Sequence, residues 1–379
     1  MIGGTCDSAF EPVLAAFAEN FSVRGETGAA LCVTVYGRTF VDLWGGWTSP
    51  ARRTPWAPDT LVDIFSVGKG MLALLAAHLA GTGQLESDAP VARYWPEFAA
   101  EEKHAVTLRQ LLSHQAGLPA IRRRLPPDAM LDWQLMAAAI AGERPWWPPG
   151  TGHGYHVNTF GFAVGEVMRR ITGKTVGTLL RERVARPLGA DIHIGLPVAE
   201  HYRVADFDWP AGTLAEADPT GLDETRLMEH NAYFNPAGLS GAGVVNTARW
   251  REAEVPSANC HGSARGVARV YAALAAGGTL GGVKVVDRGA LADATCEQAN
   301  GPDLILHRPS RFGLGFQLTQ PERPMGRGTG AFGHFGAGGS LGFADPDARV
   351  AFGYAMNQGR GGWQHKHVRH FIDLVYAAL

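Results

Sequence analysis

The chain has 379 residues, more than one compact core usually holds, so we expect at least two packed lobes. Its 46% hydrophobic and 18% charged residues exclude a disordered chain. The 34 basic and 36 acidic residues leave a net charge of -2, which excludes a strongly basic binder of nucleic acid or of anionic membranes. Only five of the 34 basic residues are lysines: Lys69, Lys103, Lys174, Lys284 and Lys366.

The N-terminal residues lack the cationic start and the unbroken apolar run of a secretory signal, and no window is long and apolar enough to span a membrane. These features predict a cytoplasmic protein. The four cysteines show no Cys-x-x-Cys spacing, so a zinc or dithiol site finds no support. We therefore expect a small-molecule partner rather than nucleic acid or a membrane, and no metal or cofactor. The sequence leaves the oligomeric state open.

The first predicted elements are a β-hairpin followed by a buried helix. Residues 29–36 and 39–44 are rich in β-forming side chains and are separated by Gly37-Arg38. From Ser66 the pattern changes to an Ala- and Leu-rich stretch that ends at Gly81. This pattern predicts a helix that begins at a serine.

The middle of the chain is predicted to be mostly helical, and the last part returns to strands. Helix-like segments occur at residues 107–114, 129–141, 160–172 and 176–186. Later segments predict a helix at 263–276, a hairpin at 279–287, strands at 312–319, 340–344 and 349–356, and a final helix from about Gln364.

Strands at both ends with helices between them predict an α/β protein of the α+β type, in which one antiparallel sheet is flanked by helices. The sheet lobe would comprise residues 1–82 and 235–379, and a mostly helical lobe, residues 83–234, would be inserted into it. We expect the active site in the cleft between the two lobes.

The first candidate for chemistry is Ser66-Val-Gly-Lys69. Positions i and i+3 share one face of a helix, so the amine of Lys69 would lie beside the hydroxyl of Ser66. Burial at a helix N-terminus lowers a lysine pKa, and a neutral amine can accept the hydroxyl proton. The alternative is a surface lysine next to an N-cap serine.

The second candidate is Tyr155, in a Gly-rich loop immediately before a predicted helix. Its phenol has an ordinary pKa near that of lysine, so Tyr155 and Lys69 could share a proton. The alternative is a packing tyrosine whose hydroxyl binds backbone. His153 and His156 flank Tyr155 and could tune its proton or bind backbone.

The third candidate is the segment from Gly333 to Gly342, where glycines would let the backbone approach a substrate. It contains Gly338-Gly-Ser340-Leu-Gly342, a literal Gly-x-Ser-x-Gly sequence. That nucleophile elbow requires a strand, a sharp turn and then a helix, whereas Ser340 leads into another strand pattern. We therefore do not assign Ser340 as the nucleophile.

Taken in order, these motifs resemble a known family. Ser66-x-x-Lys69, Leu111-Leu-Ser-His-Gln-Ala-Gly-Leu118, the segment from Pro149 to Tyr155, and His334-Phe-Gly followed by Ala337-Gly-Gly are similar to the serine β-lactamase and penicillin-binding-protein superfamily. The similarity is to its class C-like branch and to the family VIII carboxylesterases, and it spans about residues 20–376. It implies a β-lactamase/transpeptidase-like fold.

The resemblance also implies a role for each matching residue. Ser66 would be the acylated nucleophile, and Lys69 with Tyr155 would activate it and later the deacylating water. The backbone amides of Ser66 and Ala337 would form the oxyanion hole. Further residues implied in substrate binding are His334, Phe335, Gly336, Gly338 and Asn158.

Two departures from the lactamase pattern favour an esterase. The Asn two residues after the tyrosine is replaced by Val157, with Asn158 one position later, and the Lys-Thr-Gly element is replaced by His334-Phe335-Gly336. The cation that would meet a β-lactam carboxylate is thus at best a partly protonated imidazole. Both changes weaken recognition of anionic amides.

We therefore predict a serine carboxylesterase that hydrolyses short-chain esters through acyl-Ser66. The alternatives are a weak class C-like β-lactamase or D-amino peptidase, and a non-catalytic binding homologue. A metal enzyme built on His365, His367 and His370 is a further alternative, but no carboxylate stands at ligand spacing.

Overall fold

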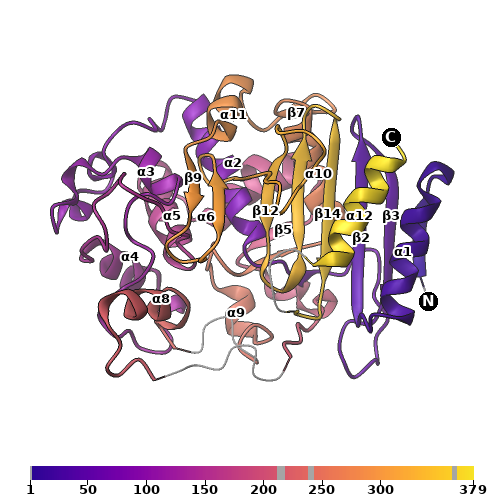
Figure 1. The fold of residues 1–379 in the computed structure, drawn as a ribbon, viewed down its shortest axis with the longest axis horizontal. Helices are drawn as coiled ribbons and strands as arrows, with labels where there is room; N and C mark the ends of the chain where they lie inside the picture. The colour runs from indigo at the N-terminus through magenta and orange to yellow at the C-terminus, as the bar shows by residue number, and fades with distance from the viewer. Residues whose placement is uncertain (1, 211–217, 238–242, 361–364) are drawn as a thin grey trace.

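The computed structural model describes residues 2–210, 218–237, 243–360 and 365–379. Its main feature is a nine-stranded sheet in which every neighbouring pair runs antiparallel (Figure 1). In spatial order the strands are β1 (Ile2–Cys6), β3 (Arg38–Gly46), β2 (Gly28–Val35), β14 (Val350–Met356), β13 (Leu341–Asp345), β12 (Phe332–Phe335), β11 (Gln317–Leu318), β10 (Pro309–Phe312) and β9 (Ala299–Pro302).

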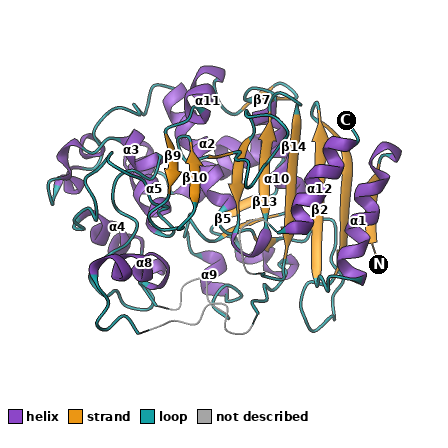
Figure 2. Ribbon diagram, viewed as in Figure 1, coloured by secondary structure: helices purple, strands orange, loops and turns teal. Residues whose placement is uncertain are grey.

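The two ends of the chain meet in the middle of this sheet. Strand β2 pairs with β14 over seven residues, with Ala29 opposite Met356 and Val35 opposite Val350. Nearly all side chains of both strands are buried, because helices cover both faces of the sheet at this point. Figure 2 shows the strands side by side from β9 and β10 to the edge of the molecule at which the N-terminus lies.

Helices cover the two faces of the sheet. On one face lie α1 (Glu11–Ser22) and α12 (Lys366–Ala377), which pack on each other, and Figure 1 shows α12 crossing in front of the strands. On the opposite face α10 (Ala264–Ala275) packs on β14, β2 and β13. The predicted mixed α/β fold with a flanked antiparallel sheet is confirmed.

Helix α2 (Val67–Gly81) lies in the core, between the sheet and the helices of the middle of the chain. Most of its residues are buried, in agreement with a sequence that is apolar on every side of the helix. Gly70 allows the close approach, since a Cβ there would stand 2.3 Å from the Tyr271 hydroxyl of α10. This packing fixes the N-terminus of α2, and with it Ser66.

The regular elements in the described part of residues 83–234 are helices and helical turns, together with one strand. The α-helices are α3 (Leu108–Leu112), α4 (Trp133–Ala141), α5 (Thr159–Thr172), α6 (Val176–Leu180), α7 (Arg186–Leu188) and α8 (Glu224–Phe234). Short 3₁₀ turns lie at Val91–Arg93, Pro96–Ala99, Lys103–Ala105, Ala129–Leu131 and Val198–Arg203, a π-helical turn lies at Arg181–Ala185, and another 3₁₀ turn lies near the N-terminus at Ser8–Phe10.

Two smaller sheets complete the fold. Strands β4 (Val62–Asp63), β6 (Cys260–Gly262) and β5 (Ile192–Ile194) form one of them, and the hairpin of β7 (Thr279–Leu280) and β8 (Val283–Lys284) forms the other. The remaining elements are α9 (Ala248–Glu252), α11 (Arg288–Thr295) and a 3₁₀ turn at Ala337–Gly339. The division into lobes at residues 82/83 and 234/235 stays a prediction.

The structure differs from the expected elements in several places, and β9, α8, α9 and α11 were not among the predicted elements. Strand β1 and helix α1 were not expected, because their residues mix Gly, polar and apolar side chains without a clear period. The strand predicted at 312–319 is wrong as one piece, since β10 and β11 are separated by a turn with Gly315 at φ +85°. The predicted helix start at Gln364 lies outside the described residues, and α12 begins at Lys366.

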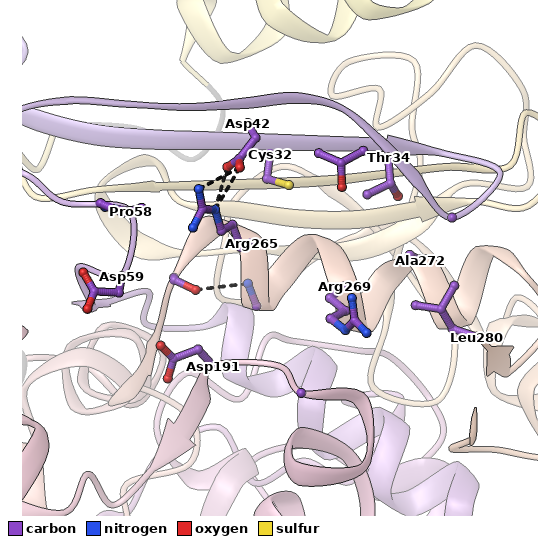
Figure 3. A pocket seen from close by; sticks show the side chains of 15 residues that line it. Cys32, Thr34, Asp42, Pro58, Asp59, Asp191, Arg265, Arg269, Ala272 and Leu280 are labelled. Carbon is purple, nitrogen blue, oxygen red and sulfur yellow. Dashed lines mark hydrogen bonds and ion pairs between the residues drawn. The ribbon is translucent and has the colours of Figure 1, made fainter. Parts of the chain in front are cut away.

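Within the described residues, no helix combines the length and the apolar character that crossing a membrane requires. A cavity of about 310 Å³ lies between strands β2 and β3 and helix α10 (Figure 3). It is lined by charged and polar side chains, among them Asp42 and Arg265, which form an ion pair. As far as the structure describes this cavity, none of the predicted site residues lines it.

Candidate active site

Ser66 lies at the N-terminus of α2, directly after a backbone turn that a buried carboxylate holds. The preceding residue, Phe65, has a left-handed backbone (φ +48°), and its N–H donates to Asp63 Oδ1 at 2.8 Å. The Phe65 ring packs on Phe207, with ring centroids 4.7 Å apart. Ser66 itself is 6% exposed, and its hydroxyl makes no helix-capping hydrogen bond. The hydroxyl is therefore available to another group.

Lys69 supplies that group. Its side chain is fully buried, and Nζ lies 3.1 Å from Ser66 Oγ. Nζ also donates to the carbonyls of Val157 at 2.7 Å and Ser257 at 3.0 Å, and Ser66 Oγ donates to the same Ser257 carbonyl at 3.2 Å. Burial lowers the pKa of Lys69 well below its usual value. The alternative of a surface lysine is wrong.

Tyr155 completes a three-residue cluster. Its ring is fully buried, and Lys69 Nζ stands 4.8 Å from the ring centroid. Burial raises the pKa of the phenol far above its usual value, and a hydrogen bond with Ser66 opposes that rise. Burial thus favours the neutral form of both groups, a neutral amine on Lys69 and an intact phenol on Tyr155. The amine can accept a proton while the phenol can donate one.

The predicted oxyanion-hole residues lie on two elements that pack together. Ser66 begins α2, and Ala337 follows the end of β12. Gly336 brings them close, because a Cβ on it would stand 2.3 Å from the Ile64 carbonyl. Gly338, at φ +80°, completes the turn. In the described part of the chain, neither the Ser66 nor the Ala337 N–H donates to a backbone oxygen.

His334 was predicted to contact substrate, but the structure encloses its side chain completely. Its side chain is fully buried, with Nδ1 2.7 Å from the Phe335 carbonyl, and its ring centroid is 6.0 Å from that of Tyr155. Burial, with a smaller effect of Lys69, lowers its pKa to about 3. A mainly neutral imidazole fits the expectation that this position carries at best a partly protonated ring. Phe335 is buried and its N–H donates to Gln317 Oε1.

Asn158 does not join the cluster around Ser66. Its side chain is 4% exposed, and Nδ2 donates to the Ala232 carbonyl of α8 at 3.1 Å. The backbone carbonyl of Val157, one residue earlier, accepts from Lys69 instead. The structure therefore brings together Ser66, Lys69 and Tyr155, and it holds Asn158 against α8.

Two groups beside the cluster were not expected. The Ser257 carbonyl contacts both Ser66 and Lys69, and since any residue type supplies a carbonyl, no sequence signal marks it. His114 is fully buried with φ +62°; its carbonyl accepts from Gly154 N and its Nδ1 accepts from His156 N, both at 3.1 Å. His114 thus accepts hydrogen bonds from the backbone N–H groups on both sides of Tyr155.

The remaining sequence candidates lie elsewhere. Ser340 is fully buried with Oγ 3.9 Å from Met356 Sδ, and strand β13 follows it, so no nucleophile elbow exists there. The rings of His365 and His367 stack with centroids 5.5 Å apart, while His370 points to solvent. Among the residues that the structure describes, no three His, Cys, Asp or Glu side chains gather closely enough to hold a metal ion.

The chain is similar to known proteins over almost its whole length. The family model described as Beta-lactamase matches residues 14–377. The esterase/beta-lactamase LipL of Mycobacterium tuberculosis is 36% identical over 360 residues, which cover 94% of this chain and 82% of LipL. A crystal structure of a family VIII carboxylesterase is 40% identical with a TM-score of 0.92, and a penicillin-binding protein homologue from Caulobacter crescentus is 39% identical with a TM-score of 0.93; each covers 100% of both chains.

Proposed function

The chain belongs to the Beta-lactamase family, and we propose that it hydrolyses small carboxylic esters with short acyl chains through an acyl-enzyme on Ser66. As a member of this family with relatives named esterase and carboxylesterase, it is a serine hydrolase. The observation that carries the proposal is the contact of the buried Lys69 amine with the Ser66 hydroxyl at 3.1 Å, where burial lowers the pKa of the lysine well below its usual value.

In the acylation step, Ser66 Oγ attacks the ester carbonyl carbon while its proton passes to Lys69 Nζ. The negative charge on the carbonyl oxygen is held by the N–H groups of Ser66 and Ala337. The bond to the alcohol oxygen then breaks, and the leaving alkoxide takes a proton from Tyr155, which regains it from Lys69. The products are the free alcohol and acyl-Ser66, with Lys69 neutral again.

Deacylation repeats these proton transfers with water in place of the alcohol. Water attacks the acyl carbon as its proton passes to the base formed by Lys69 and Tyr155, and the proton then returns to Ser66 Oγ when the acid leaves. Ser66 and Ala337 belong to the predicted sheet lobe and Tyr155 to the predicted helical lobe. We therefore place the reaction where those two parts of the chain meet.

Three features support an ester over an anionic amide. His334 is neutral, so it offers no charge to a substrate carboxylate. Asn158 donates to Ala232 rather than facing Ser66, and Val157 has no side-chain amide that could contact an acylamide. The alkoxide of an ester is also a better leaving group than the nitrogen of an amide, and an ester substrate needs neither contact.

The test compares two serines with p-nitrophenyl butyrate as substrate. Ser66→Ala should lower kcat/KM by more than about 10³-fold, because the nucleophile is lost. Ser340→Ala is the control, since Ser340 is also buried but lies outside the cluster, and its activity should stay within about twofold. Full activity of Ser66→Ala would overturn the proposal.

A weak β-lactamase activity is the second candidate, supported by the name of LipL, esterase/beta-lactamase, at 36% identity. The same acyl-Ser66 chemistry would open the lactam ring. Because His334 is neutral, we expect nitrocefin turnover to stay far below ester turnover. A higher kcat/KM for nitrocefin than for p-nitrophenyl butyrate would reverse the ranking of the two functions.

A further inference from the structure

A buried carboxylate outside the cluster holds the backbone of Tyr155. Asp303 lies in the loop between β9 and β10, is 3% exposed, and is separated from Tyr155 by 148 positions along the chain. Its Oδ1 accepts the Tyr155 N–H at 3.1 Å and also the N–H groups of Ile305 and Leu306, each at 2.9 Å. The carboxylate therefore ties its own loop to the backbone of the tyrosine.

The second oxygen of Asp303 belongs to a hydrogen-bonded chain that includes two more side chains. Ser310 Oγ donates to Asp303 Oδ2 at 2.7 Å, and His153 Nε2 lies 2.8 Å from the same hydroxyl. Because the hydroxyl gives its only proton to the carboxylate, the imidazole must be the donor in its contact with Ser310. His153 stands two residues before Tyr155, and its carbonyl accepts the Leu304 N–H at 3.1 Å.

The backbone N–H groups of three successive residues, Gly154 to His156, are thus bound by two different residues. The Gly154 and His156 N–H groups donate to the carbonyl and to Nδ1 of His114, and the Tyr155 N–H between them donates to Asp303. The Tyr155 ring in turn lies nearly parallel to Phe312 of β10, with an interplanar angle of 7°. Neither backbone nor ring can turn without breaking a buried contact.

On this basis, which rests on the proposed function, we propose that Asp303 is a positioning residue that orients Tyr155 for proton transfer at Ser66. A carboxylate that accepts three amide N–H groups and one hydroxyl makes charge-assisted hydrogen bonds, which are stronger and geometrically stricter than neutral ones. Misplacing a reacting group by about 1 Å can cost about 100-fold in rate, so the effect of Asp303 is expected in kcat rather than in KM.

Asp345 offers a matched control. It is 1% exposed, its Oδ1 accepts the N–H groups of Asp347 and Ala348 at 3.1 and 3.3 Å, and its Oδ2 accepts the Tyr376 hydroxyl at 2.5 Å. It thus has nearly the same bonding pattern as Asp303, but it lies at the end of β13, away from the cluster. Any effect of losing a buried carboxylate in general should appear equally in both variants.

The decisive experiment is a double-mutant cycle with Tyr155→Phe, with p-nitrophenyl butyrate as substrate. In the wild-type background Asp303→Ala should lower kcat about 30- to 100-fold with KM within about threefold, while Asp345→Ala leaves kcat within about twofold. In the Tyr155→Phe background Asp303→Ala should cost less than about threefold, because no phenol remains to be oriented. A general disturbance of the fold would cost the same factor in both backgrounds.

Asp303→Asn guards against a variant that does not fold. Its Oδ1 still accepts the three N–H groups, whereas its amide N–H₂ cannot accept from Ser310, so we expect kcat to fall only about 3- to 10-fold. Equal factors for Asp303→Ala in the two backgrounds, or an Asp303→Asn loss as large as that of Asp303→Ala, would overturn this inference alone. Full activity of Tyr155→Phe would instead overturn the role proposed for Tyr155, and the inference with it.

Discussion

Lys69 and Lys103 are both fully buried, and each Nζ lies near an aromatic ring, 4.8 Å from the centroid of Tyr155 and 5.3 Å from that of Phe98. Lys103 Nζ donates to three backbone carbonyls at 2.9, 2.9 and 2.6 Å, those of Ala100, Ala141 and Glu143. At Lys69 the hydroxyl of Ser66 takes the place of one carbonyl. A carbonyl only accepts a hydrogen bond, whereas a hydroxyl can lose its proton, so the third partner decides what the lysine can do.

The surrounding charges separate the two lysines further. Burial is the main cause that lowers the pKa of both. For Lys103 the carboxylates of Glu101 and Glu143 oppose the effect, and its pKa falls only to about 8. For Lys69 burial acts without such a counterweight, and its pKa falls well below the usual value. Lys103 therefore remains mostly a structural cation at neutral pH, while Lys69 is a base.

The largest expected effect tests Lys69 as a base. Lys69→Met keeps a side chain of similar length but removes the amine, so kcat/KM for p-nitrophenyl butyrate should fall about 10³-fold. Lys69→Arg should lose nearly as much, because a guanidinium stays protonated and cannot accept the Ser66 proton. Lys103→Met provides the control, with activity per folded molecule within about threefold. An active Lys69→Arg enzyme would contradict the assignment of Lys69 as the base.

The next effect concerns stability. Here the Lys103 variant should lose more than the Lys69 variant, whereas for activity the Lys69 variant should lose more. Lys103→Met leaves the carbonyls of Ala141 and Glu143 without their donor, at about 1 kcal/mol each, and takes one of two donors from the Ala100 carbonyl, so the free energy of unfolding should fall by about 2–3 kcal/mol. Lys69→Met should cost less, because only the Val157 carbonyl loses its donor, while the Ser257 carbonyl still accepts from Ser66 Oγ, and because the change removes an amine whose burial is unfavourable. Urea unfolding of both variants measures the difference. A larger loss for Lys69→Met would remove the distinction between base and structural cation.

The third effect is a rise of stability with pH in the alkaline range, to which both buried lysines contribute because burial lowers the pKa of each, and which the Lys103→Met variant separates into its Lys103 part. The pKa of Lys103 is about 8 when folded and 10.5 when unfolded, so between these values the unfolded chain binds more protons and stability rises with pH. Subtracting the curve of Lys103→Met from that of the wild type should isolate this rise, with a slope of up to about 1.4 kcal/mol per pH unit between pH 8 and 10.5. A flat difference would show that Lys103 keeps its ordinary pKa.

The sequence predicted the local part of the site and left out the part that depends on distant segments. Ser66 and Lys69 could be paired because they are three positions apart on a helix that the sequence indicates clearly. The similar pKa values of phenol and amine suggested that Tyr155 could share a proton with Lys69, but only the family resemblance placed the two together. The segments that meet here are far apart, as the contact of Lys69 with the Val157 carbonyl spans 88 positions. Neither the Ser257 carbonyl nor the Asp303 carboxylate has a residue pattern that marks it.

The fold followed the same division. Strand β14 and helices α2 and α10 were predicted because their side chains are apolar in long, regular runs. Strand β1 was missed because an edge strand with two glycines and little burial carries no such pattern. The buried neutral state of His334 could not be predicted either, because it depends on how deeply the packed sheet and α2 enclose the ring.

The smallest expected effect tests whether lysine is required only where it is buried. Lys284 is 63% exposed with Nζ 3.1 Å from Asp287, and an arginine can make the same contact, so Lys284→Arg should change the free energy of unfolding by less than about 0.5 kcal/mol and leave kcat/KM unchanged. Lys103→Arg should be clearly destabilising, because a planar guanidinium does not fit three carbonyls that surround a compact ammonium group. In a chain with only five lysines among 34 basic residues, this contrast would show that arginine can replace lysine at the surface. A loss above about 1 kcal/mol for Lys284→Arg would mean that the scarcity of lysine says nothing about Lys69 and Lys103.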